Sequence, residues 1–180
     1  MAMVNGSRAG RPERTARDVL RAYSGGFPIK VKTIAKAHGC RIIEAKLDAE
    51  VSGLLIRDNG SIVIAINDSE PETRQRFTVA HEIGHLLMHR GRPLLVDADV
   101  KINKRTPTNG FATPTEETEA NRFAAALLMP AAEIERVLKR MKLPTGRVSE
   151  AIIAKLHQHF GVSEASMQYR LMNLGLYLPH

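Results

Sequence analysis

Hydrophobic and polar residues follow a helical spacing at the start of the chain and a strand-like spacing further on. Before residue 40, apolar residues recur every three or four positions, which predicts two short helices, at 13–23 and 31–37. β-Branched runs then predict three short strands, at 40–45, 51–57 and 61–67. Asp58-Asn59-Gly60 separates the last two runs and predicts a tight hairpin, because asparagine and glycine tolerate positive φ.

Helical spacing dominates the rest of the chain. Ser69 followed by Glu72 has the pattern of a capping box and predicts a long helix that ends near His89. Residues 91–114 are rich in proline, lysine, asparagine and threonine, which predicts a long connection. Four further helices are expected, at 115–128, 131–141, 148–160 and 163–174. The predicted fold class is α+β, with a small antiparallel three-stranded sheet packed on the long helix and further helices around it.

Two histidines stand four residues apart on this long helix, within Phe77-Thr78-Val79-Ala80-His81-Glu82-Ile83-Gly84-His85. One helical turn separates His81 from His85, so both imidazoles can reach one ion, and neutral imidazole is a good ligand for Zn²⁺. Glu82 points sideways from the pair, where it can take a proton from a water molecule held at the ion. The alternative is an ordinary amphipathic helix with surface histidines.

A catalytic zinc site needs a third protein ligand, and acidic residues open the next long helix. Glu117 and Asn121 are four apart, so Glu117 can ligate zinc while Asn121 orients a ligating histidine through its other ring nitrogen. Glu119 is a rival ligand and Glu116 a weaker one. Acids at a helix N-terminus can also serve only to complement the helix dipole. Ala120 leaves room for this helix to pack closely on the histidine helix.

Two other residues allow more than one interpretation. His89, one turn after His85, either extends the histidine face or is a cation at the end of the helix. Cys40 could place a thiolate in the fourth zinc position and inhibit the enzyme, or be a buried core residue. A single cysteine excludes an internal disulfide and fits a reducing compartment, so we expect a cytoplasmic protein.

The formal net charge is +7, and the basic excess lies in residues 1–50 and 101–150. Such an excess favours contact with a polyanion, or forms a solvated basic surface. Gly161 and Ser163 between the last two predicted helices imitate a helix-turn-helix, which we interpret as structural packing. The sequence contains no apolar run long enough for a membrane span, and its first residues lack the apolar core of a secretory signal.

The two central motifs, RFTVAHEIGHLL at 76–87 and ETEANRFAAALLMP at 117–130, resemble those of the ImmA/IrrE family of metallopeptidases. The resemblance extends more loosely over residues 28–176. It implies a zinc-dependent endopeptidase that cleaves a helix-turn-helix transcriptional repressor in a stress, DNA-damage or phage-defence response. It also implies that His81, His85 and Glu117 are the zinc ligands and that Glu82 is the catalytic base.

The chain length, the periodicity and the resemblance together give the expected domain organisation. Residues 1–10 are expected to be a flexible tail, 11–146 a zincin-like metallopeptidase domain, and 147–180 a helical pair packed on the same domain. Many relatives carry a fused helix-turn-helix domain that we do not find near the N-terminus here, so the expected substrate is a separately encoded protein.

Other partners and functions are also considered. DNA, in particular single-stranded DNA, is considered as an activator that binds the basic surface. The alternative function is a DNA-responsive regulator, or a toxin, whose zinc is mainly structural. The oligomeric state is left open.

Overall fold

The computed structural model describes residues 10–89, 94–98, 112–141 and 148–177, and for 94–98 only the backbone. The predicted tail therefore lies outside the described residues, apart from Gly10. The helices are α2 (Arg11–Arg21), α3 (Val31–Ala37), α4 (Glu72–Met88), α5 (Pro114–Leu128), α6 (Ala131–Arg140), α7 (Glu150–Phe160) and α8 (Glu164–Asn173). The strands are β1 (Cys40–Ala45), β2 (Val51–Asp58), β3 (Ser61–Asn67) and β4 (Leu94–Ala98).

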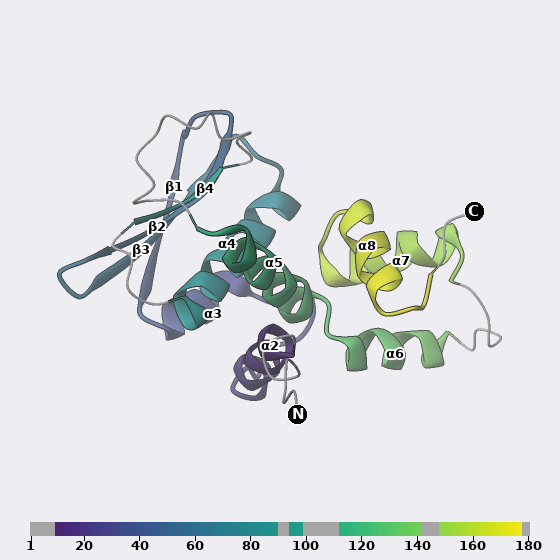
Figure 1. Ribbon diagram of the computed structural model, residues 1–180. Coiled ribbons are helices and arrows are strands. Elements are labelled where there is room, and N and C mark those ends of the chain that lie inside the picture. The colour runs from purple at the N-terminus through teal and green to yellow at the C-terminus, as the bar shows by residue number, and fades with distance from the viewer. Residues whose placement is uncertain (1–9, 90–93, 99–111, 142–147, 178–180) are drawn as a thin grey trace, which may run out of the picture.

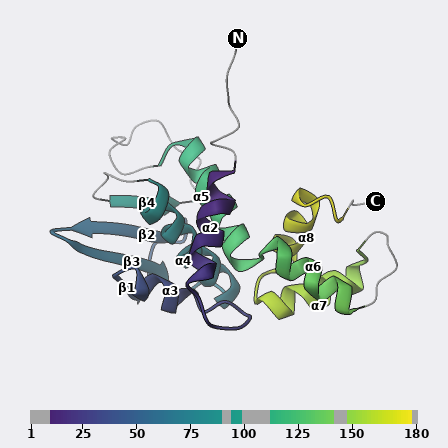
Figure 2. The same cartoon turned by 90° about the horizontal axis from the view of Figure 1, so that it is seen from below.

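The elements form a sheet side and a helical side, with α4 and α5 between them. In both views the sheet lies on one side of this central helix pair, and α6, α7 and α8 lie on the other (Figures 1 and 2). The predicted α+β class is confirmed, and the helices lie within about two residues of their predicted bounds. Among the described residues, no helix combines the length and apolarity needed to cross a bilayer.

The sheet differs from the prediction in strand number and in direction. It has four strands in the order β1-β3-β2-β4. β2 pairs antiparallel with β3 and with β4, but β1 pairs parallel with β3. The expectation of three antiparallel strands is therefore wrong on both points. β4 lies within the segment that the sequence assigned to a long connection.

A side chain at the end of β3 explains the parallel pairing. The chain from β1 to β2 passes over the end of β3, and Asn67 holds this connection through its amide nitrogen. Nδ2 donates to the carbonyl oxygens of Asp48 and Val51 at 3.3 and 3.0 Å. Asn67 is buried, so these bonds also satisfy a polar group that would otherwise lack water. β1 thus reaches the far side of β3 through a crossing that hydrophobic alternation does not predict.

The predicted turn between β2 and β3 is confirmed, whereas the predicted helix cap is not. Asn59 and Gly60 both have positive φ, 43° and 82°, as a tight hairpin turn requires. α4 begins at Glu72 after Pro71, without a side-chain cap. Ser69 instead bonds through its hydroxyl to Oδ1 of Asn67, at 2.7 Å, and so belongs to the β3 end rather than to the helix.

One face of β2 packs on α4. Alternate residues of a strand share a face, and Gly53, Leu55 and Arg57 form the face that meets the helix. A Cβ built on Gly53 would lie 2.4 Å from Cγ2 of Thr78 and 3.4 Å from Oε1 of Glu82. Leu55 is fully buried. The missing side chain at Gly53 therefore lets the sheet approach the middle of α4.

The C-terminal helices are attached to the central pair through two arginines. Arg76 on α4 donates to the carbonyl oxygens of Gly161 and Phe160, at 2.9 and 3.3 Å. Arg170 on α8 is buried and donates to the carbonyl oxygen of Met129, at 3.0 Å. These are contacts between the two parts; the division into domains remains a prediction.

Replacing Gly53 with alanine is expected to destabilise the protein. The added methyl group would overlap Thr78 and force β2 and α4 apart, at a cost of about 1–3 kcal/mol for overpacking. Urea unfolding followed by circular dichroism measures this change. Gly26→Ala is the matched control, because a Cβ at Gly26 meets nothing within 4 Å. Equal stabilities for the two variants would contradict this account of the β2–α4 contact.

Candidate metal centre

The site depends on how closely α4 and α5 approach each other. Gly84 on α4 lies against α5, where an added Cβ would be 3.0 Å from Cδ1 of Phe123 and 3.2 Å from Cα of Ala120. Ala120 and Phe123 are fully buried at this contact. Small residues on both helices thus allow backbone approach, as the sequence predicted for Ala120. The consequence is that a side chain from the first turns of α5 can reach the histidines of α4.

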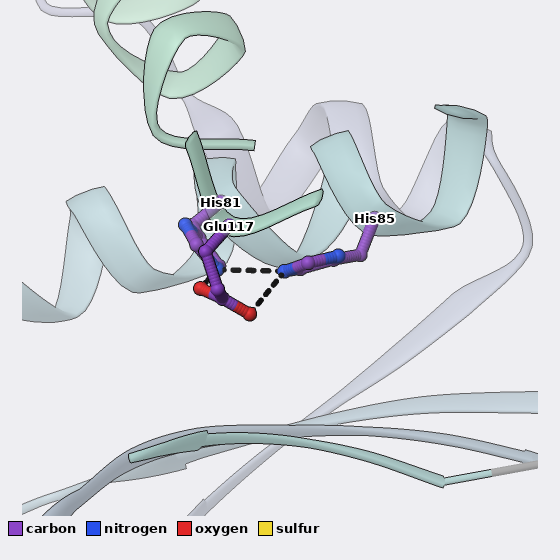
Figure 3. Close-up of side chains that lie close together, drawn as sticks. All are labelled: His81, His85 and Glu117. Atoms are coloured by element: carbon purple, nitrogen blue, oxygen red, sulfur yellow. Dashed lines mark hydrogen bonds and ion pairs between the residues drawn. The ribbon is translucent and has the colours of Figure 1, made fainter. Parts of the chain in front are cut away.

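Three predicted residues converge at this contact, His81 and His85 from α4 and Glu117 from α5 (Figure 3). Nε2 of His81 lies 2.8 Å from Nε2 of His85. The two oxygens of Glu117 lie 3.2 Å from Nε2 of His81 and 3.3 Å from Nε2 of His85. One donor atom from each residue thus falls within 4.8 Å of the others, a grouping that could hold a metal ion.

Burial differs among the three donors. His81 and His85 are 2% and 1% exposed, whereas the Glu117 side chain is 33% exposed. The histidines are held rigidly by the core, and the site meets solvent beside the carboxylate. A catalytic metal site combines these properties, because a fixed ligand set must leave room for water and substrate.

The electrostatics of the cluster favour the protonation states that bind metals. Burial alone would raise the pKa of Glu117, but hydrogen bonds and charge from His81 and His85 outweigh it and lower the pKa to about 2. Burial lowers the pKa of His85, and the hydrogen bond to Glu117 only partly opposes this. At neutral pH, Glu117 is therefore a carboxylate and His85 a neutral imidazole, the forms that ligate a cation.

Each histidine uses its other ring nitrogen for a second contact. Nδ1 of His81 lies 2.9 Å from Oδ1 of Asn121, the contact that the four-residue spacing of Glu117 and Asn121 predicts. Nδ1 of His85 lies 3.0 Å from Nδ1 of His89. Both Nε2 atoms are therefore left to face the cluster, and both rings are held in orientation from behind.

The structure separates the three acidic candidates of α5. Glu117 is the one that reaches both histidines. Glu119 lies 2.9 Å from Nε2 of His89, and Glu116 closes a capping box with Thr113 at the start of α5. His89 contacts both His85 and Glu119, so it extends the histidine face. The alternative, a simple cation at the helix end, does not account for these two contacts.

Glu82, the predicted base, is fully buried next to His81. The backbone of Gly53 lies close to its carboxylate, because a Cβ built there would be 3.4 Å from Oε1. Burial lowers the pKa of Arg57, and attraction to Glu82 acts in the opposite direction. The buried carboxylate of Glu82 and the guanidinium of Arg57 on β2 thus attract each other electrostatically.

Arg57 is a residue of the site that the sequence analysis missed. It donates from β2 to the carbonyl oxygens of His85 and His89, at 3.2 and 3.0 Å, where α4 ends. A cation at a helix C-terminus satisfies free carbonyl groups and complements the dipole. The only available signal was a charged residue at an inward-facing position of a strand.

Cys40 does not join the cluster of donors within the described residues. It is buried at the start of β1, and burial raises the pKa of its thiol to about 11, although Arg57 acts to lower it. A neutral buried thiol is a poor metal ligand. These observations favour the core interpretation of Cys40 over inhibition through the metal.

Comparison with known proteins identifies the family. Residues 35–172 match the model of the Peptidase M78 family, described as the IrrE N-terminal-like domain. This stretch holds the sheet, all four residues of the candidate centre and most of the C-terminal helices. The match confirms the family that the two central motifs predict.

Two curated relatives are named radiation response metalloprotease IrrE. The chain is 39% identical to the protein from Deinococcus radiodurans and 41% identical to that from Deinococcus deserti, each over 110 residues. These residues are 61% of this chain but only 30% and 35% of the relatives, so the likeness spans about a third of their length.

A solved structure, a transcriptional regulator of Mycobacterium tuberculosis, has a similar fold. Its TM-score is 0.58 at 16% identity, over 89% of this chain and 46% of that one.

Replacing Arg57 with alanine is expected to loosen the C-terminal end of α4. Loss of two charge-assisted bonds to carbonyl groups should lower the free energy of unfolding by about 1–3 kcal/mol. Hydrogen exchange should speed up at the amides of residues 86–89 more than elsewhere in α4. Arg41→Ala, at an exposed position of β1, is the control. Unchanged exchange at these amides in the Arg57 variant would show that the contact does not hold the helix.

Proposed function

Since the chain belongs to the Peptidase M78 family, we propose that it is a zinc-dependent endopeptidase that cleaves a specific partner protein. His81, His85 and Glu117 are the proposed zinc ligands, and Glu82 is the proposed catalytic base. One observation carries the proposal: the convergence of two imidazole nitrogens and a carboxylate, each within about 3 Å of the others.

The residues present fit a zinc ion. Donors at roughly 2.0–2.1 Å in a tetrahedral array lie about 3.3 Å apart. The separations of Glu117 from the two histidines are 3.2 and 3.3 Å, and that of the histidines is 2.8 Å. Oδ1 of Asn121 is an acceptor, so it supports the tautomer of His81 that has its hydrogen on Nδ1. In that tautomer Nε2 has a lone pair for a metal ion, which would replace the hydrogen bond to Glu117.

The chain's own residues supply the remaining parts of a hydrolytic site. When bound, zinc would act as a Lewis acid that acidifies a water molecule and polarises the scissile carbonyl group. Glu82 would accept the proton of the attacking water and deliver it to the leaving nitrogen.

The substrate is proposed to bind as an extended strand along β4. β4 is an edge strand, and in the described part of the chain only β2 pairs with it. The other edge, β1, is contacted by α3. An added strand would satisfy the backbone groups of the peptide at an edge of the sheet that packs on α4.

The proposed substrate is a separately encoded transcriptional repressor, cleaved in the cytoplasm during a stress, DNA-damage or phage-defence response. The family motifs and the relatives named for a radiation response support this assignment. The burial of both histidines and Glu82 supports a selective enzyme, with Glu117 as the more exposed of the proposed ligands. A single cysteine fits the reducing cytoplasm.

The alternative is a DNA-responsive regulator that reads DNA through α7 and α8. Gly161, with φ 61°, and the cap at Ser163 give these helices a helix-turn-helix-like turn. A recognition helix must present its exposed face to the major groove. The exposed face of α8, with Tyr169 and Asn173, borders a groove of about 1100 Å³ that α2 and α5 also line, and it presents no lysine. Arg170, the only arginine of α8, is buried.

These observations favour the peptidase. A gel shift at rising salt concentration tests for DNA binding, and addition of DNA to the cleavage assay tests for activation. Growth arrest on expression of the chain alone would favour a toxin.

Glu82→Gln should abolish cleavage and leave zinc in place. The amide keeps the shape of the side chain but cannot take a proton. Electrophoresis measures cleavage of a candidate repressor, and emission spectroscopy measures metal content. Glu72→Gln, exposed in the first turn of the same helix, is the matched control. Cleavage at the unaltered rate by the Glu82 variant would refute the assigned mechanism.

Glu117→Gln should weaken zinc binding at neutral pH. The substitution removes the one negative ligand, so affinity should fall by more than the roughly 10–100-fold typical of losing an outer partner. Competition with a chromophoric chelator measures the dissociation constant. Glu135→Gln, exposed on α6, serves as the control for charge alone. If Glu117→Gln binds zinc as tightly as that control, the ligand set is wrong.

A further inference from the structure

A second layer of side chains lies behind His85. Nδ1 of His85 is 3.0 Å from Nδ1 of His89, and Nε2 of His89 is 2.9 Å from Oε2 of Glu119. The side chains of His89 and Glu119 are only 8% and 12% exposed. The three residues thus form an unbroken chain of contacts from the carboxylate on α5 to the candidate metal centre.

The acceptor at the end of this chain determines where each hydrogen lies. A carboxylate only accepts, so Nε2 of His89 must be the donor to Glu119. In the neutral tautomer of His89 that matches this bond, Nδ1 carries a lone pair and can accept from Nδ1 of His85. In the matching tautomer of His85, with its hydrogen on Nδ1, Nε2 has a lone pair for a metal ion, which would replace the hydrogen bond to Glu117. The opposite tautomer of His85 would put a hydrogen on the atom that has to ligate the ion.

His89 is itself held from three directions. It follows the last residue of α4 with an extended backbone, φ −119° and ψ 92°, and its amide still donates to the carbonyl of His85. Arg57 donates to its carbonyl oxygen from the sheet, and Glu119 accepts from its ring. The imidazole therefore has a fixed position although the helix has ended.

From these contacts we propose that His89 and Glu119 are positioning residues, which fix the tautomer and ring orientation of His85 for zinc. The inference rests on the ligand set of the proposed function. It also distinguishes the two histidine ligands: the neutral amide of Asn121 supports His81, whereas a carboxylate acting through His89 supports His85. A charged partner makes His85 the stronger electron donor of the two.

The test measures zinc affinity rather than turnover. His89→Phe keeps a ring but removes the acceptor, and it should lower zinc affinity about 10–100-fold. Glu119→Gln should lower it by a smaller factor, because the amide oxygen still accepts a hydrogen bond without the charge. His38→Phe, at an exposed position, and Glu135→Gln are the matched controls. Competition with a chromophoric chelator gives each dissociation constant, and substitution by cobalt reports ligand geometry through its visible absorption.

The double variant gives the sharper result. If Glu119 acts through His89, adding Glu119→Gln to His89→Phe should change zinc affinity no further. Additive losses would overturn the proposal, since they would mean that the two residues act separately. Control-like affinity and an unaltered cobalt spectrum in both single variants would also overturn it. Melting of the metal-free proteins identifies a variant that fails to fold, and Glu119→Gln, being isosteric, keeps the test decisive in that case.

A failure of this inference can be told apart from a failure of the proposed function. If the unaltered protein binds no zinc, or if Glu117→Gln binds it equally well, the ligand set itself is wrong. If the unaltered protein binds zinc and Glu117→Gln does not, the affinities of the His89 and Glu119 variants decide the inference on its own.

Discussion

The candidate centre depends on one packing constraint, the close approach of α4 and α5 at Gly84. Ala120 and Phe123 contact this glycine at distances that leave no room for a side chain. α4 supplies two ligands and the base, but the carboxylate comes from α5. A metal site divided between two helices can be only as well defined as the distance between them. The smallest side chains of the two helices therefore set the geometry of the most polar residues.

The sheet provides the second constraint, through the face of β2 that meets α4. Gly53 allows close approach beside Glu82, Leu55 fills the core, and Arg57 binds the carbonyl groups at the helix end. Three alternate residues of β2 thus set how close the strand lies to α4, fill the contact between them and bind the C-terminal end of the helix. This arrangement keeps Glu82 buried between α4 and the sheet.

Local patterns in the sequence predicted the parts of the structure that local physics decides. Helix bounds, the Asn59-Gly60 turn and the contact of Asn121 with His81 all follow from spacing along one element. The parallel pairing of β1 was not predictable in this way, because alternation tells which face a residue occupies but not which strand lies beside it. It depends on Asn67 bonding to a connection 16–19 residues earlier in the chain.

The same distinction applies within the site. The spacing of His81, Glu82 and His85 on one helix identified them as candidates. Glu117 and Glu119 could not be separated from the sequence, because the choice depends on how α5 is rotated against α4. Arg57 was missed since its partners are backbone carbonyl groups, which leave no trace in side-chain patterns.

Arginines attach the two halves of α4 to different parts of the molecule. Arg76 binds the carbonyl groups of Phe160 and Gly161 at the bend of the C-terminal pair, and burial lowers its pKa. Arg57 joins the other end to the sheet. Guanidinium–carbonyl bonds depend strongly on direction, so these contacts help to fix how α4 is oriented relative to the sheet and to the C-terminal pair. Helices that supply no donor atom therefore help to hold the helix that supplies two of them.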